Sequence, residues 1–211
     1  MTTRPVPGLR ERKRAETQAR IEAAATSLVR RDGLAETTID AISAQADISP
    51  RTFFNYFDSK DSAILGLPSR EVSDDDLRAA LTSGPAGESV ATAVVRMVLT
   101  VMGTPTPATS TVHRDRLAII RAHPELISGQ FGQLSDRKNR MSEAVARFLA
   151  AHPGFSDAPD IAAHADLVLS CCASAARTAL HEWAATADPS TTDTIEQRAL
   201  ALVASTIRRL S

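Results

Sequence analysis

Residues 37–60 read TTIDAISAQADISPRTFFNYFDSK, and this stretch decides the fold. Two helix starts can be read within it. Thr37 and Asp40 have the spacing of a capping box, which indicates that a helix of about two turns begins here. Ser49 followed by Pro50 indicates a second start, because serine caps helix N-termini and proline is favoured in the first turn. The stretch therefore predicts two short helices joined by a tight turn.

A third short helix follows, since Asp58-Ser59 ends the second one and caps another that begins at Lys60. One longer helix precedes them: between residues 11 and 32, apolar residues recur at intervals of three and four, and Gly33 then stops the pattern. The three pieces between residues 38 and 66 are too short to be stable alone, so they need a shared core. We expect that core to contain Leu28, Ile42, Phe53, Phe57 and Ile64.

The rest of the chain also has a helical pattern, with proline and glycine between the segments. No strand-like alternation of apolar and polar residues persists anywhere. The sequence therefore predicts an all-α fold, with a small N-terminal three-helix unit and a larger C-terminal helical bundle. The helices expected in the larger part cover residues 74–82, 87–102, 112–122, 124–151, 159–186 and 193–209.

Charge and aromatic residues are unevenly distributed along the chain. The 211 residues carry a net charge of -1, which by itself gives no sign of a nucleic-acid partner. Residues 1–31, however, hold eight Arg or Lys and three Glu, so they carry +5 and the rest of the chain carries -6. Four of the eight aromatic residues lie between residues 53 and 57. These two clusters are the first candidates for function.

Several classes of protein are disfavoured by composition. No run of eighteen apolar residues exists, and the basic N-terminus leads into no apolar segment, so neither a membrane span nor a signal peptide is expected. Cys171 and Cys172 are adjacent, which provides neither a disulfide framework nor a CxxC metal site. We expect a cytoplasmic protein without a metal or cofactor.

The string from Thr37 to Lys60 resembles the helix-turn-helix of the TetR family of bacterial transcriptional regulators, and the resemblance covers about 50 residues. It implies a DNA-binding domain at residues 1–66, with a basic N-terminal arm, and a dimerisation and ligand-sensing domain at residues 67–211. Two positions depart from the family pattern. Asp47 stands where glycine is usual, so it is expected to adopt a left-handed conformation at some cost. Phe54 stands where tyrosine is frequent, which removes a hydroxyl that could reach a phosphate.

The recognition helix of such a motif presents its first turn to base edges in the major groove. Arg51 can donate two hydrogen bonds to guanine, Asn55 can pair with adenine, and Phe54 can meet a thymine methyl. Thr38, Tyr56 and Lys60 are expected to hold phosphates, and the arm from Arg4 to Arg14 adds attraction that weakens with salt. The expected DNA contacts are Thr38, Ser49, Pro50, Arg51, Thr52, Phe54, Asn55, Tyr56 and Lys60.

The last two expected helices, at about 159–186 and 193–209, carry more apolar surface than one buried stripe needs. The resemblance implies that they form a four-helix homodimer interface, while a thick monomer core is the alternative. A ligand pocket, if present, is expected between these helices and those at 87–151. Its candidate lining residues, each of which could equally be ordinary core, are Met97, Val101, Leu117, Arg121, Phe131, Leu134, Cys171 and Trp183.

The function expected from this pattern is a homodimeric repressor that binds a double-stranded DNA operator and is released by a small molecule. A DNA-binding regulator without a small-molecule effector is one alternative. A helical enzyme is another, but none of its nearest titratable pairs has the spacing of a metal motif. Those pairs are His113 with Asp115, His123 with Glu125, and His181 with Glu182.

Overall fold

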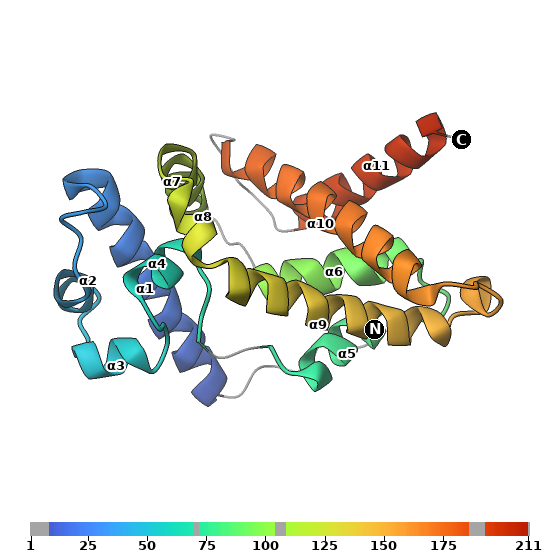
Figure 1. The fold of residues 1–211 in the computed structure, drawn as a ribbon, viewed down its shortest axis with the longest axis horizontal. Coiled ribbons are helices and arrows are strands. Elements are labelled where there is room, and N and C mark those ends of the chain that lie inside the picture. The colour runs from blue at the N-terminus through green and yellow to red at the C-terminus, as the bar shows by residue number, and fades with distance from the viewer. Residues whose placement is uncertain (1–8, 70–71, 104–108, 186–192, 211) are drawn as a thin grey trace. The chain divides into compact units, whose positions relative to one another are not determined.

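The structure is a computed structural model that describes residues 9–69, 72–103, 109–185 and 193–210. Within these ranges every regular element is helical, which confirms the predicted all-α fold (Figure 1). Contacts divide the chain into two compact units. The first consists of residues 1–71 and 108–131, and the second of residues 72–107 and 132–211. No helix among the described residues is long and apolar enough to cross a membrane.

The first unit is built on one long helix that carries three short ones. Ile21, Leu28, Ile42, Phe53, Phe57 and Ile64 are all at most 4% exposed, so the predicted shared core is confirmed. This unit extends beyond the expected segment 1–66, because two helices from later in the chain pack with it. Its elements are α1 (Leu9–Asp32), α2 (Ile39–Gln45), α3 (Pro50–Phe54), α4 (Lys60–Leu65), α7 (Ser110–Ala122) and α8 (Glu125–Gly129).

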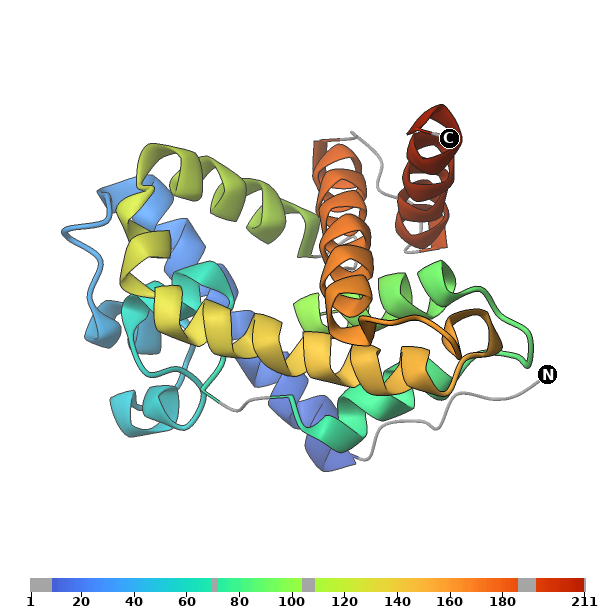
Figure 2. The same ribbon diagram turned by 45° about the vertical axis from the view of Figure 1, so that its right-hand side comes forward.

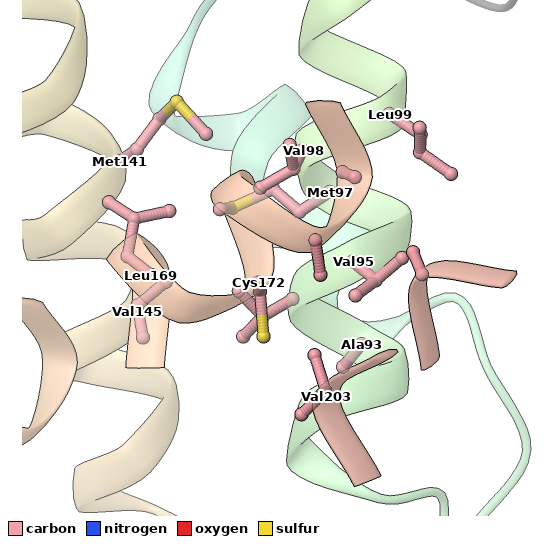
Figure 3. Packing of buried hydrophobic residues seen from close by; sticks show 14 of the residues in the cluster. Ala93, Val95, Met97, Val98, Leu99, Met141, Val145, Leu169, Cys172 and Val203 are labelled. Atoms are coloured by element: carbon pink, nitrogen blue, oxygen red, sulfur yellow. The ribbon is translucent and has the colours of Figure 1, made fainter. Parts of the chain in front are cut away.

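The second unit is a bundle of longer helices. α10 and α11 pack on each other, and both pack on α6 (Figures 1 and 2). Figure 3 shows the resulting core, in which Leu169 and Cys172 of α10 lie between side chains of α9 and of α6. The elements are α5 (Asp74–Thr82), α6 (Val90–Met102), α9 (Phe131–Ala150), the 3-10 turn η2 (Pro153–Phe155), α10 (Ile161–Ala185) and α11 (Asp193–Leu210).

Two expectations about helix boundaries were wrong. The helix expected over 124–151 is interrupted, since α8 ends at Gly129 and α9 begins at Phe131. Glycine is a poor helix former, and Gln130 between the two helices has left the helical conformation, with φ -110° and ψ 14°. At the start of α2 the capping residue is Thr38 rather than Thr37. The Thr37 hydroxyl instead donates to the carbonyl oxygen of Gly33 at 2.8 Å.

The short helices of the first unit are stabilised at their ends by side chains. Thr38 accepts a hydrogen bond from the Ala41 N–H at 3.1 Å, and Ser49 accepts one from the Thr52 N–H at 3.0 Å. Ser59 and Ser62 form a reciprocal capping box at the start of α4. Such caps satisfy N–H groups that have no partner inside the helix, which matters most for helices of five to seven residues.

Candidate nucleic-acid interface

The turn between α2 and α3 contains the left-handed residue that the sequence predicts. Asp47 has φ 53° and is the one non-glycine residue with positive φ in the described part of the chain. The Ile48 N–H donates to the carbonyl oxygen of Ser43 and the Asp47 N–H to that of Ala44, at 3.0 and 3.2 Å. This is a Schellman motif, which commonly places glycine at the position that Asp47 occupies. The motif fixes the direction in which α3 leaves α2.

α3 has a buried side and an exposed side. Phe53 on the helix and Phe57 just beyond it are completely buried and anchor this segment in the core. The exposed side carries Arg51, Phe54 and Asn55, whose side chains are open to solvent. The Phe54 ring is 53% exposed and stands edge-on to Phe53, with ring centroids 5.6 Å apart. A basic, an aromatic and an amide side chain are thus brought to one open surface.

The other expected contacts around α3 are arranged differently. Pro50 is exposed in the first turn, while Thr52 is half-buried and its hydroxyl lies 2.8 Å from that of Ser49. Thr38 and Ser49 are exposed, but each uses its side-chain oxygen to cap a helix. Their backbone amides and hydroxyls therefore lie at helix N-termini, where the helix dipole favours an anion.

Lys60, expected as a phosphate contact, has two partners inside the protein. Its Nζ donates to the carbonyl oxygens of Leu34 and Thr37, at 2.8 and 2.9 Å. The ammonium thus ties α4 to the loop between α1 and α2. Since a lysine ammonium has three donors, one remains beyond these two bonds. No sequence pattern indicates this contact, because the partners are backbone atoms 26 and 23 residues away.

Tyr56 is half-buried and is covered by a side chain that the sequence assigned to the arm. The guanidinium carbon of Arg14 lies 4.8 Å from the centroid of the Tyr56 ring. The same guanidinium donates to the carbonyl oxygen of Asn55 at 3.3 Å. A signal for this was present, because Arg14 lies seven residues before the buried Ile21 and so shares its face of α1.

The basic excess of residues 1–31 is concentrated in the first half of α1. Arg4 lies outside the described residues. Near the end of the helix, Arg31 forms an ion pair with Asp32 at 2.7 Å, and Arg30 lies 3.6 Å from Asp115. The hydrogen bond from Arg31 lowers the pKa of the Asp32 carboxyl. The exposed basic side chains of the helix away from these pairs are Arg10, Arg12, Lys13 and Arg20.

A largely buried polar cluster joins α7 to α1 and α4. Arg116 donates to the carboxylate of Glu22 at 2.7 Å and to the carbonyl oxygen of Ile64 at 2.8 Å. Its guanidinium lies so close to Gly66 that a Cβ there would be 2.8 Å from it. Burial, followed by the charge of Arg116, lowers the pKa of His113 to about 4, although Glu22 acts in the opposite direction. His113 is therefore neutral at physiological pH.

The candidate ligand-lining residues are distributed over both units. Leu117 and Arg121 of α7 and Phe131 belong to the first unit, and Phe131 is 71% exposed. In the second unit, Met97 and Trp183 are core residues, and Val101 and Cys171 pack against the same apolar cluster, whereas Leu134 is half-buried. Burial raises the pKa of the neighbouring Cys172 thiol to about 12, so this thiol is inert at neutral pH.

The helices expected to form a dimer interface keep some apolar side chains exposed. On α10 the buried face includes Ala165, Ala176 and Ala179, while Leu167 is 70% exposed. On α11, Ile207 and Leu210 are 55% and 83% exposed. Among the described residues, no group of three or more His, Cys, Asp and Glu could hold a metal ion.

Comparisons with known proteins match both parts of the chain. Residues 21–64 match the model of bacterial regulatory proteins of the tetR family, and residues 88–208 match the MftR C-terminal domain. The HTH-type transcriptional regulator TcmR of Streptomyces glaucescens is 29% identical over 153 residues. That alignment covers 70% of this chain and 65% of TcmR, slightly less than two thirds of the relative.

Solved structures that match the chain include GusR of Salmonella enterica, at a TM-score of 0.46 and 17% identity over 90% of this chain and 92% of that one. Thermus thermophilus FadR, a TetR-family repressor solved in complex with lauroyl-CoA, gives a TM-score of 0.40 and 19% identity, over 89% and 93% of the two chains. The second family model spans α7 and α8, which pack in the first unit. With both family models matched in order, the chain belongs to the TetR family of bacterial regulatory proteins.

Proposed function

We propose that this protein is a cytoplasmic, sequence-specific DNA-binding regulator of transcription that acts as a homodimeric repressor. One observation carries the proposal: the exposed side of α3 presents Arg51, Phe54 and Asn55, while Phe53 and Phe57 anchor the segment in the core. A short, rigidly held helix with such a surface suits readout of the major groove. Membership of a family of regulatory proteins supports the same function.

The residues of α3 and its surroundings divide into base readers and phosphate ligands. Arg51 and Asn55 are the base readers, since guanidinium and carboxamide groups make bidentate hydrogen bonds to guanine and adenine. Phe54 provides an apolar contact for a thymine methyl. The phosphate ligands are Thr38, Ser49, Thr52, Tyr56 and the remaining donor of Lys60. Pro50 has no N–H to donate, so its ring makes an apolar contact with the DNA.

We propose that α10 and α11 form the homodimer interface. Their exposed apolar side chains, Leu167, Ile207 and Leu210, support this assignment. Exposed alanines on α11, such as Ala201 and Ala204, would allow a second helix to approach closely. A two-fold dimer also suits the function, because two recognition helices can then meet half-sites about one helical turn apart.

Release by a small molecule is the further part of the proposal. Leu117 and Arg121 lie on α7, which packs on α1 and α4, so a ligand bound there would act on the unit that carries α3. Such a ligand lowers the affinity of the protein for DNA by some factor. Bound DNA must then lower the affinity of the protein for the ligand by the same factor. A regulator without an effector is the second candidate, and the complete burial of Met97 favours it, because that side chain fills core.

Selection from random-sequence duplexes, followed by gel shifts with the purified protein, tests the proposal. We expect one enriched, two-fold symmetric sequence and a dimer in solution by light scattering. Arg51→Ala should weaken specific binding by roughly tenfold to a hundredfold and relax the preference at one position of each half-site. Arg78→Ala, on the exposed face of α5, is the matched control. A folded protein that enriches no sequence and shows no salt-dependent affinity for DNA would refute the function.

A further inference from the structure

We propose that Arg14 is a positioning residue that holds the C-terminal end of the recognition helix α3, and that it does not bind a DNA phosphate. This inference rests on the proposed DNA-binding function. It takes Arg14 out of the basic arm, where its sequence position places it, and assigns it to the C-terminal end of α3.

α3 has only five residues, so its two ends make up most of the helix. Ser49 stabilises the N-terminal end through its hydrogen bond with the Thr52 N–H. At the other end, the Asn55 N–H bonds to the carbonyl oxygen of Thr52 at 3.1 Å. The carbonyl oxygen of Asn55 lies beyond the last turn, and the guanidinium of Arg14 donates to it at 3.3 Å. A cation at a helix C-terminus is also favoured by the helix dipole.

The same guanidinium covers Tyr56, the residue that follows Asn55. The Arg14 guanidinium carbon lies 4.8 Å from the ring centroid, in the range of a cation–π contact. The backbone of Tyr56 is fixed as well, because its N–H donates to Phe53 at 2.9 Å and its carbonyl oxygen accepts from the Ser69 N–H at 2.8 Å. With the backbone bonded on both sides, the contact with the guanidinium further restricts the ring.

Position on α1 separates Arg14 from its basic neighbours. Arg14 is half-buried on the face of Ile21, whereas Arg12 and Lys13 beside it are exposed. An arginine is needed for this contact, because its planar guanidinium can stack on a ring and donate from its edge at once. A lysine ammonium is a point charge and can make one of these contacts well but not both.

Two protein groups thus engage the charge of Arg14. Each phosphate contact that a cation makes changes the slope of log affinity against log salt by about 0.9, because one counterion is released. A residue that acts only by positioning leaves that slope unchanged and weakens specific binding more than non-specific binding. The salt dependence therefore distinguishes the two roles of an arginine.

The experiment compares the wild-type chain with Arg14→Met, Arg14→Lys and Arg12→Met. The probes are a duplex that the wild-type protein has enriched from random sequence and a scrambled duplex of equal length. Affinities are measured at salt concentrations from about 50 to about 300 mM. Arg14→Met and Arg14→Lys should both weaken binding to the enriched duplex, by about tenfold for Met, with an unchanged salt slope. Arg12→Met is the control for an exposed cation on the same helix.

A second measurement needs no DNA. Tyr56 is the only tyrosine of the chain, so selective labelling gives one set of ring resonances. These should shift in Arg14→Met and stay in place in Arg12→Met, while thermal unfolding shows that both variants are folded. Unshifted resonances in Arg14→Met would refute the contact itself.

Three outcomes with DNA are informative in different ways. A slope reduced by about 0.9 in Arg14→Met, with equal losses on both duplexes, would make Arg14 a phosphate ligand and overturn the inference. Unchanged affinity in a folded Arg14→Met would overturn it too. If the wild-type protein enriches no duplex, the proposed function fails instead, and the tyrosine resonances still test the contact between Arg14 and Tyr56.

Discussion

The two units are held together in different ways. In the first, α2, α3 and α4 have five to seven residues, and each depends on a capping side chain. Its largely buried ion pair joins Arg116 to Glu22, which are 94 residues apart in the chain. In the second unit, helices of up to 25 residues share one apolar core, and the ion pair of Arg96 with Glu88 spans only eight residues. The first unit thus depends on side-chain caps and on a polar contact between segments far apart in the chain, and the second on one apolar core.

Glycine has a related role in both units. A Cβ on Gly66 would lie 2.8 Å from the Arg116 guanidinium, and a Cβ on Gly84 would lie within 3 Å of the Glu88 carboxylate. Each ion pair therefore rests against a residue that has no side chain. Gly66 also has φ 69°, so its backbone as well as its surroundings favours glycine. The comparison predicts that the first unit is more sensitive to changes at such polar contacts.

The largest effect is expected from Arg116→Met. Removal of the guanidinium leaves the Glu22 carboxylate, 16% exposed, without its cation, and the Ile64 carbonyl without its donor. The free energy of unfolding should fall by roughly 3 to 5 kcal/mol, measured by urea denaturation. Combining Arg116→Met with Glu22→Met should restore part of the loss.

Arg147→Met is the matched control in the second unit. Arg147 and Asp74 lie on different helices, but their side chains are 57% and 63% exposed. Loss of this ion pair should lower the free energy of unfolding by less than about 1 kcal/mol, because solvent screens exposed pairs. An equal decrease in unfolding free energy for Arg116→Met and Arg147→Met would contradict the proposed difference between the two units.

A pH effect of intermediate size is expected from His113. Its folded-state pKa of about 4 lies below the ordinary value of 6.5, so the unfolded chain takes up this proton first as the pH falls. The contribution of His113 to stability is therefore fully present above pH 6.5 and is lost as the pH falls towards 4. The free energy of unfolding should decrease by up to about 3 kcal/mol over this range. Denaturation at several pH values should show the decline, and His113→Gln should flatten it. A decline that persists unchanged in His113→Gln would assign it to other groups.

Gly66→Ala should have a smaller effect, of roughly 1 to 3 kcal/mol. The left-handed backbone penalises any Cβ, and the Cβ would also push the Arg116 guanidinium from its site. Gly33→Ala is the control, because Gly33 has φ +93° but nothing within 4 Å of the added carbon. The difference in unfolding free energy between the two variants isolates the crowding of the ion pair. Equal costs would show that Arg116 moves aside freely.

The smallest expected effect is a gain of stability from Asp47→Gly. Asp47 adopts φ 53° in a motif that usually has glycine, so the substitution should relieve about 0.5 to 1 kcal/mol of backbone strain. Differential scanning calorimetry would show a slightly raised Tm. A lowered Tm would indicate that the Asp47 side chain stabilises the turn by more than its backbone costs.

Local signals predicted much of the fold. α5 occupies residues 74–82 as expected, and Ser49-Pro50 begins α3, because capping depends on residues within one turn. The break between α8 and α9 was missed, since Gly129 lies within an otherwise periodic pattern.

For the site, the exposed face of α3 followed from the spacing of Phe53 and Phe57 in the core. The contacts of Lys60 with backbone carbonyls and of Arg116 with Glu22 were not predictable. They depend on which distant segments meet, and no pattern within a helix encodes that. The sequence also places α7 in the larger domain, and the second family model likewise spans it. Its contacts group it with the first unit, and these contacts again join segments far apart in the chain.

The position of Arg116 has a consequence for building hybrid regulators. Joining residues 9–71 to the second unit of another protein would leave behind α7, and with it the cation of Glu22 and the donor to Ile64. A transplantable head must also bring residues 109–131, so the graft needs junctions at three points of the chain, near residues 71, 107 and 131. Exchange of parts between such regulators is thus a matter of interleaved segments rather than of one cut.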